Sequence, residues 1–259
     1  MKSKAKSKTQ RSSTRAPSRD KEQPHDVYRI RGANADHVET LGLREQNKVD
    51  KFQRIYAAAR RQFAEVGYDG TTLRDIAKEA RVALGTLGFY AENKRELVLL
   101  IFNEFMPPVI ERCREAGIYQ GSLVDAVVAH FRPVYAAYAA EPDLFRTILR
   151  ENVFHTTSPH AREFSRIRLE TVSHLRDIVS KARDAGEIMP YIDVDLAART
   201  IFYLMFASVR WWLHTTNKPL VEPGLAELRT MTALLLDGMK SGKAEVAPAT
   251  RRAPVRNRT

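Results

Sequence analysis

The residues with the clearest chemical meaning lie in the segment 67–97, where the sequence places two short helices on either side of a tight turn. The hydroxyl of Thr72 and the carboxylate of Asp75 have the spacing of a capping box, which satisfies the free amides of a first helical turn. Residues 81–83 form the turn, and residues 84–90 form the second helix. A helix this short can lie in the major groove of DNA, about 12 Å wide, so the chemistry we expect is non-covalent recognition of DNA.

A further helix must position this unit, and the residues upstream predict one. Apolar residues recur there at helical spacing, and Gly67 supplies the left-handed residue that ends the helix. The apolar residues are Phe52, Ile55, Ala59, Phe63 and Val66. Three helices therefore make a small headpiece.

Residues 48–97 resemble the N-terminal domain of the TetR family of transcriptional regulators. The residues that match the pattern of that family in one register are Gly67, Tyr68, Thr71, Thr72, Ile76, Ala77, Ala80, Val82, Gly85, Thr86, Leu87, Tyr90, Lys94 and Leu97. The resemblance implies that DNA phosphates are held at Thr72, Thr86, Tyr90 and Lys94, and that base edges are approached at Leu84 and Gly85.

Four residues depart from the family pattern inside the recognition unit. Arg81 replaces the glycine of the family pattern at the turn. If the backbone there is left-handed, a residue with a Cβ destabilises it by about 1 kcal/mol. Ala83 replaces the Ser or Thr that caps the second helix, a change also worth about 1 kcal/mol. Gly88 and Ala91 replace aromatic residues, and Gly85 with Gly88 lowers helix propensity further. We therefore expect a recognition helix that is loosely held until DNA orders it.

Beyond residue 97 the spacing of apolar residues predicts helices throughout, separated by Pro and Gly residues, and no segment shows the alternation typical of a strand. We expect Pro107 and Pro108 to kink or split a helix that spans residues 96–116. The predicted fold class is all-α, a three-helix headpiece followed by a larger helical domain for ligand binding and dimerisation. The expected divisions are a basic N-terminal extension (1–47), the helix-turn-helix domain (48–97), the helical domain (98–239) and a basic tail (240–259).

The whole net charge of +11 comes from the two tails, and the residues between them are close to neutral. Residues 1–19 carry seven Lys or Arg and no acid, and residues 240–259 carry six against Glu245. Such segments cannot bury enough surface to fold alone, so we expect disordered arms that either attract DNA phosphates or keep the chain in solution. No apolar core of a signal peptide follows the lysines, and a transit peptide is the weaker alternative.

The segment IFYLMFASVRWWL is apolar nearly all round, so it must be covered on more than one face. In TetR-like proteins the last two long helices pair with those of a partner, which implies a homodimer through residues 194–214 and 224–239. Arg210, Trp211 and Trp212 suit such an interface, although the tryptophans could equally fill the core of one chain.

Aromatic residues on adjacent helices of the larger domain are candidates for the wall of a ligand pocket, with core packing as the alternative for each. They are Phe131, Tyr135, Tyr138, Phe145, Phe154, Phe164 and Phe206. The family resemblance implies a small apolar or aromatic effector whose binding spreads two headpieces.

The leading hypothesis is a dimeric, ligand-responsive repressor that binds a double-stranded DNA operator in the cytoplasm, associated with the nucleoid. It is not an enzyme and needs no cofactor. The alternatives are a nonspecific or architectural DNA binder acting through its basic tails, and a metal-dependent enzyme using Glu151 and His155 with His130 or His174. The single Cys113 excludes an internal disulfide and a cysteine-based zinc site, and no apolar run is long enough to span a membrane.

Overall fold

The computed structural model describes residues 42–151 and 158–240. Within these ranges the chain forms helices and no strands, which confirms the expected all-α class. The helices are α2 (Leu43–Glu65), α3 (Leu73–Glu79), α4 (Leu84–Tyr90), α5 (Lys94–Ala116), α6 (Leu123–Ala140), α7 (Pro142–Glu151), α8 (Pro159–Asp184), α9 (Val194–Thr215) and α10 (Val221–Lys240). The expected arms, except for Lys240 at the end of α10, lie outside the described residues, as do Phe154 and His155.

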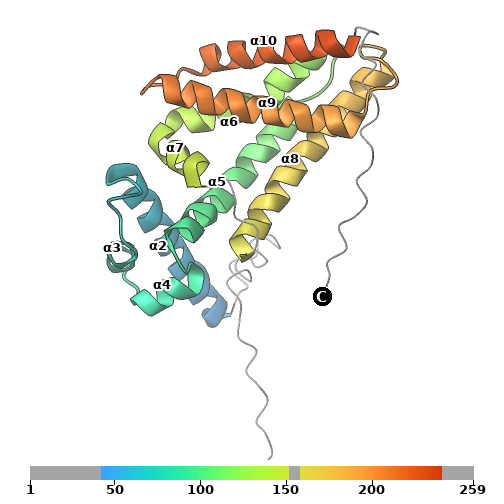
Figure 1. Ribbon diagram of the computed structural model, residues 1–259. Coiled ribbons are helices and arrows are strands. Elements are labelled where there is room, and N and C mark those ends of the chain that lie inside the picture. Colours follow the sequence, from blue (N-terminus) through green and yellow to red (C-terminus); the bar gives the residue numbers. More distant parts are fainter. Residues whose placement is uncertain (1–41, 152–157, 241–259) are drawn as a thin grey trace, which may run out of the picture.

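Helices α2, α3 and α4 form a headpiece at one end of the molecule, and α5 runs from it into the body (Figure 1). In the body α6 packs against α5 and α10, while α8 packs against α5 and α9. Helices α9 and α10 lie side by side across the end far from the headpiece. One continuous apolar core joins the two parts, so the headpiece does not hang from a free linker.

Short polar side chains begin most of these helices by accepting a hydrogen bond from the amide three residues on. Thr72 accepts from the amide of Asp75 at the start of α3, which confirms the predicted N-cap, whereas the Asp75 carboxylate accepts from the Thr72 hydroxyl rather than from an amide. Asn93 caps α5 in the same way, as do Ser122, Ser158 and Asp193 for α6, α8 and α9.

Two details of the headpiece differ from expectation. Helix α2 begins at Leu43, before residue 48, where we expected the helix-turn-helix domain to start. Val66 is 53% exposed and does not belong to the core, because it is the C-cap where α2 ends before the left-handed Gly67. The other four residues of the predicted apolar stripe are buried.

Helix α5 runs unbroken through Pro107 and Pro108, so the expected split is absent from this segment. Each proline removes one amide donor from the helix. The buried neighbours Met106, Val109 and Ile110 hold both halves against the core, and this burial outweighs the lost hydrogen bonds.

No helix among the described residues is both long enough and apolar enough to cross a membrane.

His130 is fully buried in α6, where Gly117 leaves room for it. A Cβ at Gly117 would lie 2.7 Å from both Cβ and Nδ1 of His130. Burial, and then the charge of nearby His174, lower the pKa of His130 to about 4 from 6.5. The folded chain therefore holds this imidazole in its neutral form.

We expect this imidazole to make folding sensitive to acid. Above pH 6.5 it is neutral in both states, whereas between pH 6.5 and about 4 only the unfolded chain takes up the proton, so stability falls as the pH falls. Between pH 7 and pH 5 the free energy of unfolding should drop by about 2 kcal/mol more in the wild type than in His130→Asn. Urea titrations at both values measure this, with His174→Asn as the control for the neighbouring imidazole. An equal drop in wild type and His130→Asn would contradict the prediction.

Candidate nucleic-acid interface and cavity

The turn between α3 and α4 is built around a left-handed arginine. Arg81 has φ 53°, as its replacement of the usual glycine led us to expect. Its amide donates to the carbonyl of Lys78 at 3.2 Å, and the amide of Val82 donates to that of Ala77 at 3.0 Å, which is the Schellman pattern of a helix end. A guanidinium nitrogen of Arg54 on α2 donates to the carbonyl oxygens of Ala80 and Arg81 at 3.2 and 3.3 Å, and so ties the turn to α2.

Helix α4 has few local supports. Its N-cap is Ala83, and no side chain caps it, as expected from the sequence. Its buried residues are Leu87 and Tyr90, which fix it to the rest of the headpiece. Packing at these two positions, rather than capping or helix propensity, therefore holds α4 in place.

The exposed face of α4 is apolar, and its two glycines leave part of the backbone uncovered by side chains. Leu84 and Phe89 are 46% and 45% exposed. A Cβ placed at Gly85 or Gly88 would meet nothing within 4 Å, so the backbone between them is open to close approach. Such a face favours apolar contact with thymine methyl groups and recognition of DNA shape over side-chain hydrogen bonds to bases. The half-buried Thr86 provides a hydroxyl on this helix.

Two of the predicted phosphate-binding residues lie in one open groove. Thr72 and Lys94 line it together with Asn93 and Arg95, where the N-termini of α3 and α5 approach each other. Lys94 Nζ donates to the carbonyl of Tyr68 at 2.6 Å and lies 4.5 Å from the centroid of its ring. The groove thus presents a hydroxyl and two cations, which is the donor set that DNA phosphates accept from.

Tyr90 is placed differently from these residues. Its ring is 4% exposed, and its hydroxyl donates to the carbonyl of Lys48 at 3.3 Å. The side chain therefore serves as an anchor of α4 in this structure. A role in holding phosphate requires the hydroxyl to leave Lys48.

The carbonyl of Tyr90 makes a contact that the sequence did not suggest. It accepts a hydrogen bond from Nε2 of His160, the second residue of α8, at 2.7 Å. A carbonyl oxygen only accepts, so Nε2 carries the proton. Burial lowers the pKa of His160, against the opposing effects of the Tyr90 carbonyl and Glu96. The backbone oxygen of His160 accepts from Nδ2 of Asn103 on α5 at 2.9 Å, so His160 joins α4, α5 and α8.

Helix α7 and the residue before it hold the other side of the headpiece through ion pairs. Arg60 of α2 donates from Nε and Nη2 to both oxygens of Glu141, with the Nε contact at 2.9 Å. Arg150 donates to both oxygens of Asp69 at 3.2 Å, and its Cζ lies 5.1 Å from the centroid of Tyr68.

The metal site considered from the sequence receives no support from the described residues. Glu151 is paired with Arg95 and Arg150, at 3.6 and 3.0 Å. In this part of the chain no group of three or more His, Cys, Asp or Glu side chains could hold a metal ion. His155 lies outside it.

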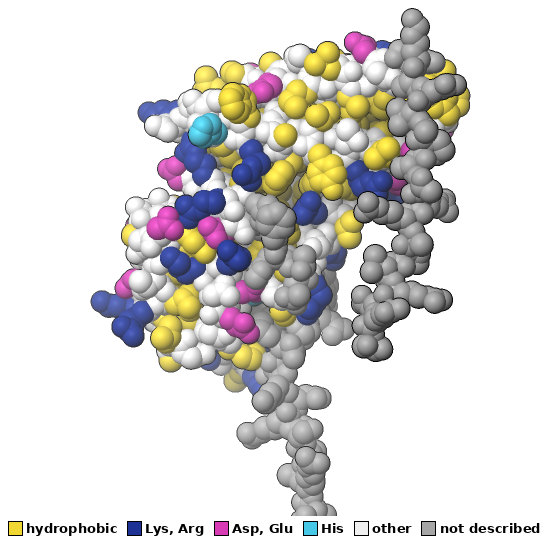
Figure 2. Space-filling model, viewed as in Figure 1, with side chains coloured by type: hydrophobic (Ala, Val, Ile, Leu, Met, Phe, Trp, Pro, Cys, Tyr) yellow, Lys and Arg dark blue, Asp and Glu magenta, His cyan; other side chains and the backbone are white. Residues whose placement is uncertain are grey.

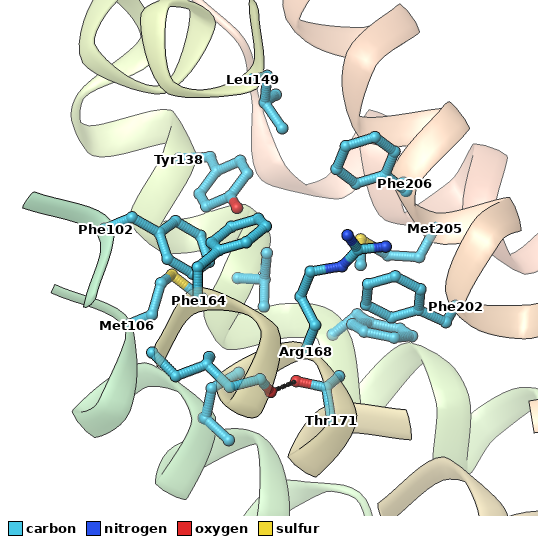
Figure 3. Close-up of a pocket in the computed structure, with 14 residues that line it drawn as sticks. Phe102, Met106, Tyr138, Leu149, Phe164, Arg168, Thr171, Phe202, Met205 and Phe206 are labelled. Atoms are coloured by element: carbon cyan, nitrogen blue, oxygen red, sulfur yellow. Dashed lines mark hydrogen bonds between the residues drawn. The ribbon is translucent and has the colours of Figure 1, made fainter. Parts of the chain in front are cut away.

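A narrow cavity lies inside the body, between α5, α6, α8 and α9 (Figure 3). Four of the predicted pocket residues line it, namely Phe131, Tyr138, Phe164 and Phe206. Further lining residues that we did not expect include Phe102, Met106 and Arg168. Their helices were predicted, but nothing in the sequence marks which face of each helix meets the cavity.

The remaining predicted pocket residues lie elsewhere. Tyr135 packs on Trp212, and its hydroxyl is hydrogen-bonded to that of Ser208 at 2.8 Å. Phe145 stacks behind Tyr138 with ring centroids 3.9 Å apart. Both therefore belong to the packing around the cavity wall rather than to the wall itself, as the core-packing alternative implied.

The cavity has a volume of about 50 Å³. Pockets that hold drug-sized ligands measure about 300–1,000 Å³. An organic ligand can therefore enter only if the lining side chains or the helices that carry them move apart.

Helices α9 and α10 expose an apolar surface on the face shown in Figure 2. Leu196, Tyr203 and Trp211 of α9 are 55%, 58% and 60% exposed, and Leu234 of α10 is 69% exposed. Trp212, which we had grouped with Trp211, is instead buried, and its Nε1 donates to the carbonyl of Leu220 at 3.0 Å. For Trp212 the structure thus favours the core-packing alternative.

Arg210 lies on the exposed side of α9 next to this surface. One of its guanidinium nitrogens donates to the carbonyl of Leu149 at 2.8 Å, and its Cζ lies 5.9 Å from the centroid of Phe206. Arg210 therefore connects α9 to α7 beside the cavity.

Comparison with known proteins gives one family match and several relatives. Residues 55–101 match the model described as bacterial regulatory proteins of the tetR family. The chain is 26% identical over 174 residues to the fatty acid metabolism regulator protein of Bacillus subtilis, which covers 67% of this chain and 89% of that protein. It is 26% identical over 153 residues to the HTH-type transcriptional repressor KstR2 of Mycobacterium tuberculosis, covering 58% of this chain and 75% of that one.

Two solved structures share the fold. FadR from Thermus thermophilus, in complex with lauroyl-CoA, superposes with a TM-score of 0.56 at 24% identity, over 76% of this chain and 99% of that one. FadR from Bacillus subtilis, in complex with stearoyl-CoA, gives a TM-score of 0.54 at 24% identity, over 74% and 100% of the two chains.

The left-handed backbone at Arg81 leads to a prediction about stability. Arg81→Gly should raise the free energy of unfolding by about 1 kcal/mol, because glycine adopts a positive φ without a Cβ clash. Urea denaturation measures the change. Arg81→Ala removes the same charge but keeps the Cβ, and should give no such gain. Equal stabilities of the two variants would contradict the prediction, and a gain shared by both would assign the effect to the charge instead of the backbone.

Proposed function

The chain is a member of the TetR family of transcriptional regulators, and we propose that it is a dimeric repressor released from its operator by a ligand with an aliphatic chain. The observation that carries the proposal is the hydrogen bond from His160 to the Tyr90 carbonyl, since it joins a helix of the cavity wall to the end of α4. The relatives are regulators, which supports this function over an architectural DNA binder and a metal-dependent enzyme.

In this proposal α4 enters the major groove of the operator. Leu84, Gly85 and Thr86 approach the bases or the adjacent phosphates, and the groove that holds Thr72 and Lys94 binds the backbone. Tyr90 contributes by holding α4 and reaches a phosphate only after leaving Lys48. The protein then acts in the cytoplasm, on DNA of the nucleoid.

The chemistry of the cavity supports a ligand with an aliphatic chain. Its wall is formed mainly by Phe, Met, Leu, Ile and Val side chains, which bind hydrocarbon by excluding water. The FadR relatives of known structure were solved with lauroyl-CoA and stearoyl-CoA, which both carry such a chain. We therefore propose a fatty acyl compound as the effector, in place of the less defined apolar or aromatic molecule expected from the sequence.

Release from DNA requires that the ligand prefer a conformation that fits the operator poorly. The small volume of the cavity provides this preference, because filling it moves α8 relative to α5 and α9. His160 lies one helical turn before Phe164, which lines the cavity. A shift of this part of α8 therefore pulls on the end of α4 or breaks its contact.

Dimerisation is expected through the exposed apolar surface of α9 and α10. Leu196, Tyr203, Trp211 and Leu234 are large side chains whose burial against a second copy would be favourable. Two headpieces would then read two half-sites about one DNA turn apart, which a single short helix cannot do. Arg210 and Trp211 stay in the proposed interface, whereas Trp212 does not.

Selection of bound fragments from random DNA tests the function. We expect an enriched motif with two-fold symmetry, and weaker binding of that motif by Thr86→Ala, which removes a hydroxyl from α4. Arg166→Ala, on an exposed part of α8, is the matched control and should bind like the wild type. Lauroyl-CoA should lower the affinity for the selected motif. A flat profile would refute the repressor and favour nonspecific binding.

A further inference from the structure

Arg168 stands out among the side chains that surround the cavity. Among the described residues that line the cavity, Arg168 carries the charge. The other lining side chains are apolar, apart from the hydroxyls of Tyr138 and Thr171. The Thr171 hydroxyl already donates to the carbonyl of Ile167 at 3.1 Å. Burial raises the pKa of Tyr138, so this phenol stays neutral. Arg168 is therefore the side chain in this wall that could bind an anionic group or a strong hydrogen-bond acceptor of a ligand.

The guanidinium of Arg168 lies between aromatic rings. Its Cζ is 5.6 Å from the centroid of Phe164 and 5.5 Å from that of Phe202, and Figure 3 shows it directed toward the space beside Phe206 and Met205. The ring faces attract the positive charge, but they provide no lone pair for its N–H groups.

Among the described residues no oxygen accepts from this arginine. Its Nε is buried and has no hydrogen-bond partner there, and no carboxylate of the described chain pairs with it. A buried donor without a partner costs free energy, and native proteins rarely leave one without a reason. An acceptor supplied by a ligand would satisfy it.

Arg168 also faces the outside of the cavity. Together with Phe202 it lines a second, open groove of about 290 Å³ between α8 and α9, whose wall includes Arg199 and no acidic residue. Arg168 and Phe202 thus lie between the narrow apolar cavity and an open basic groove. A ligand that extends from the cavity into the groove would have its aliphatic chain in the cavity and its polar part in the groove. Its first polar atoms would then lie beside Arg168.

We propose that Arg168 binds the oxygen acceptor at the head of an aliphatic chain, and so selects a fatty acyl compound over a neutral hydrocarbon of the same length. The acceptor is either the carboxylate of a free fatty acid or the carbonyl of an acyl thioester, since both present an oxygen to the guanidinium. This inference rests on the proposed function, which makes the cavity the effector site. It adds the residue that sets the chemical class of the effector.

Isothermal titration of the full-length protein with lauric acid, lauroyl-CoA and lauryl alcohol tests the inference. The wild type should bind at least one of the two acyl compounds about tenfold or more tightly than the alcohol, because hydrogen bonds from a charged donor are strong in an apolar site. A preference for the acid alone identifies the carboxylate as the acceptor, and a preference for lauroyl-CoA that is lost in Arg168→Met identifies the thioester carbonyl.

Arg168→Met keeps the length and packing of the side chain and should bind all three compounds with affinities within about threefold of the wild type's affinity for the alcohol. Arg168→Lys keeps the charge and should retain part of the preference. Arg166→Met is the matched control, because Arg166 lies on the same helix and pairs with Glu163 and Glu170 at the surface. It should behave like the wild type.

The outcomes separate the two proposals. If Arg168→Met keeps the wild-type preference for acyl compounds, the role of Arg168 is refuted while the cavity remains the effector site. If none of the three compounds binds the wild type, the proposed effector class fails, and the inference about Arg168 fails with it.

Discussion

The hydrogen bond from His160 to the carbonyl of Tyr90 is the interaction on which the placement of the headpiece most depends. It is buried, it joins the end of α4 to the start of α8, and the backbone of the same histidine is tied to α5 through Asn103. The ion pairs of Arg60 and Arg150 lie nearer the surface, where such pairs contribute about 1 kcal/mol or less. Because α8 also forms part of the cavity wall, one helix contacts both the headpiece and the cavity.

This arrangement explains why a nearly closed cavity suits a regulator. A rigid, preformed pocket could accept a ligand without moving α8, and the headpiece would then be unaffected. A cavity of about 50 Å³ must open, so binding and movement occur together. The position of Arg168 is consistent with this proposal, since its guanidinium lies between two rings, where a ligand could supply an acceptor. Helix α4 has weak local support, with Ala83 as its cap and two glycines, so its position depends on the contacts at Leu87 and Tyr90.

Much of the headpiece could be predicted from the sequence because its signals are local. The N-cap at Thr72 and the left-handed Arg81 each depend on a few neighbouring residues. The cavity and the junction with the headpiece depend on which faces of distant helices meet, and the sequence does not record this. Periodicity marked Trp211 and Trp212 equally, yet the packing of Tyr135 places Trp212 inside and leaves Trp211 outside. His160 and Arg168 gain their significance only from partners that are far away in the chain.

The most direct test is the ratio of operator affinities without and with saturating lauroyl-CoA, measured for the wild type, His160→Gln and His160→Leu. Glutamine can still donate a hydrogen bond to the Tyr90 carbonyl, whereas leucine fills similar space and cannot. Coupling through this contact predicts a ratio of about ten or more in the wild type, a similar ratio in His160→Gln and a ratio near one in His160→Leu. A folded His160→Leu protein with the wild-type ratio would contradict the link between the cavity and the headpiece through α8.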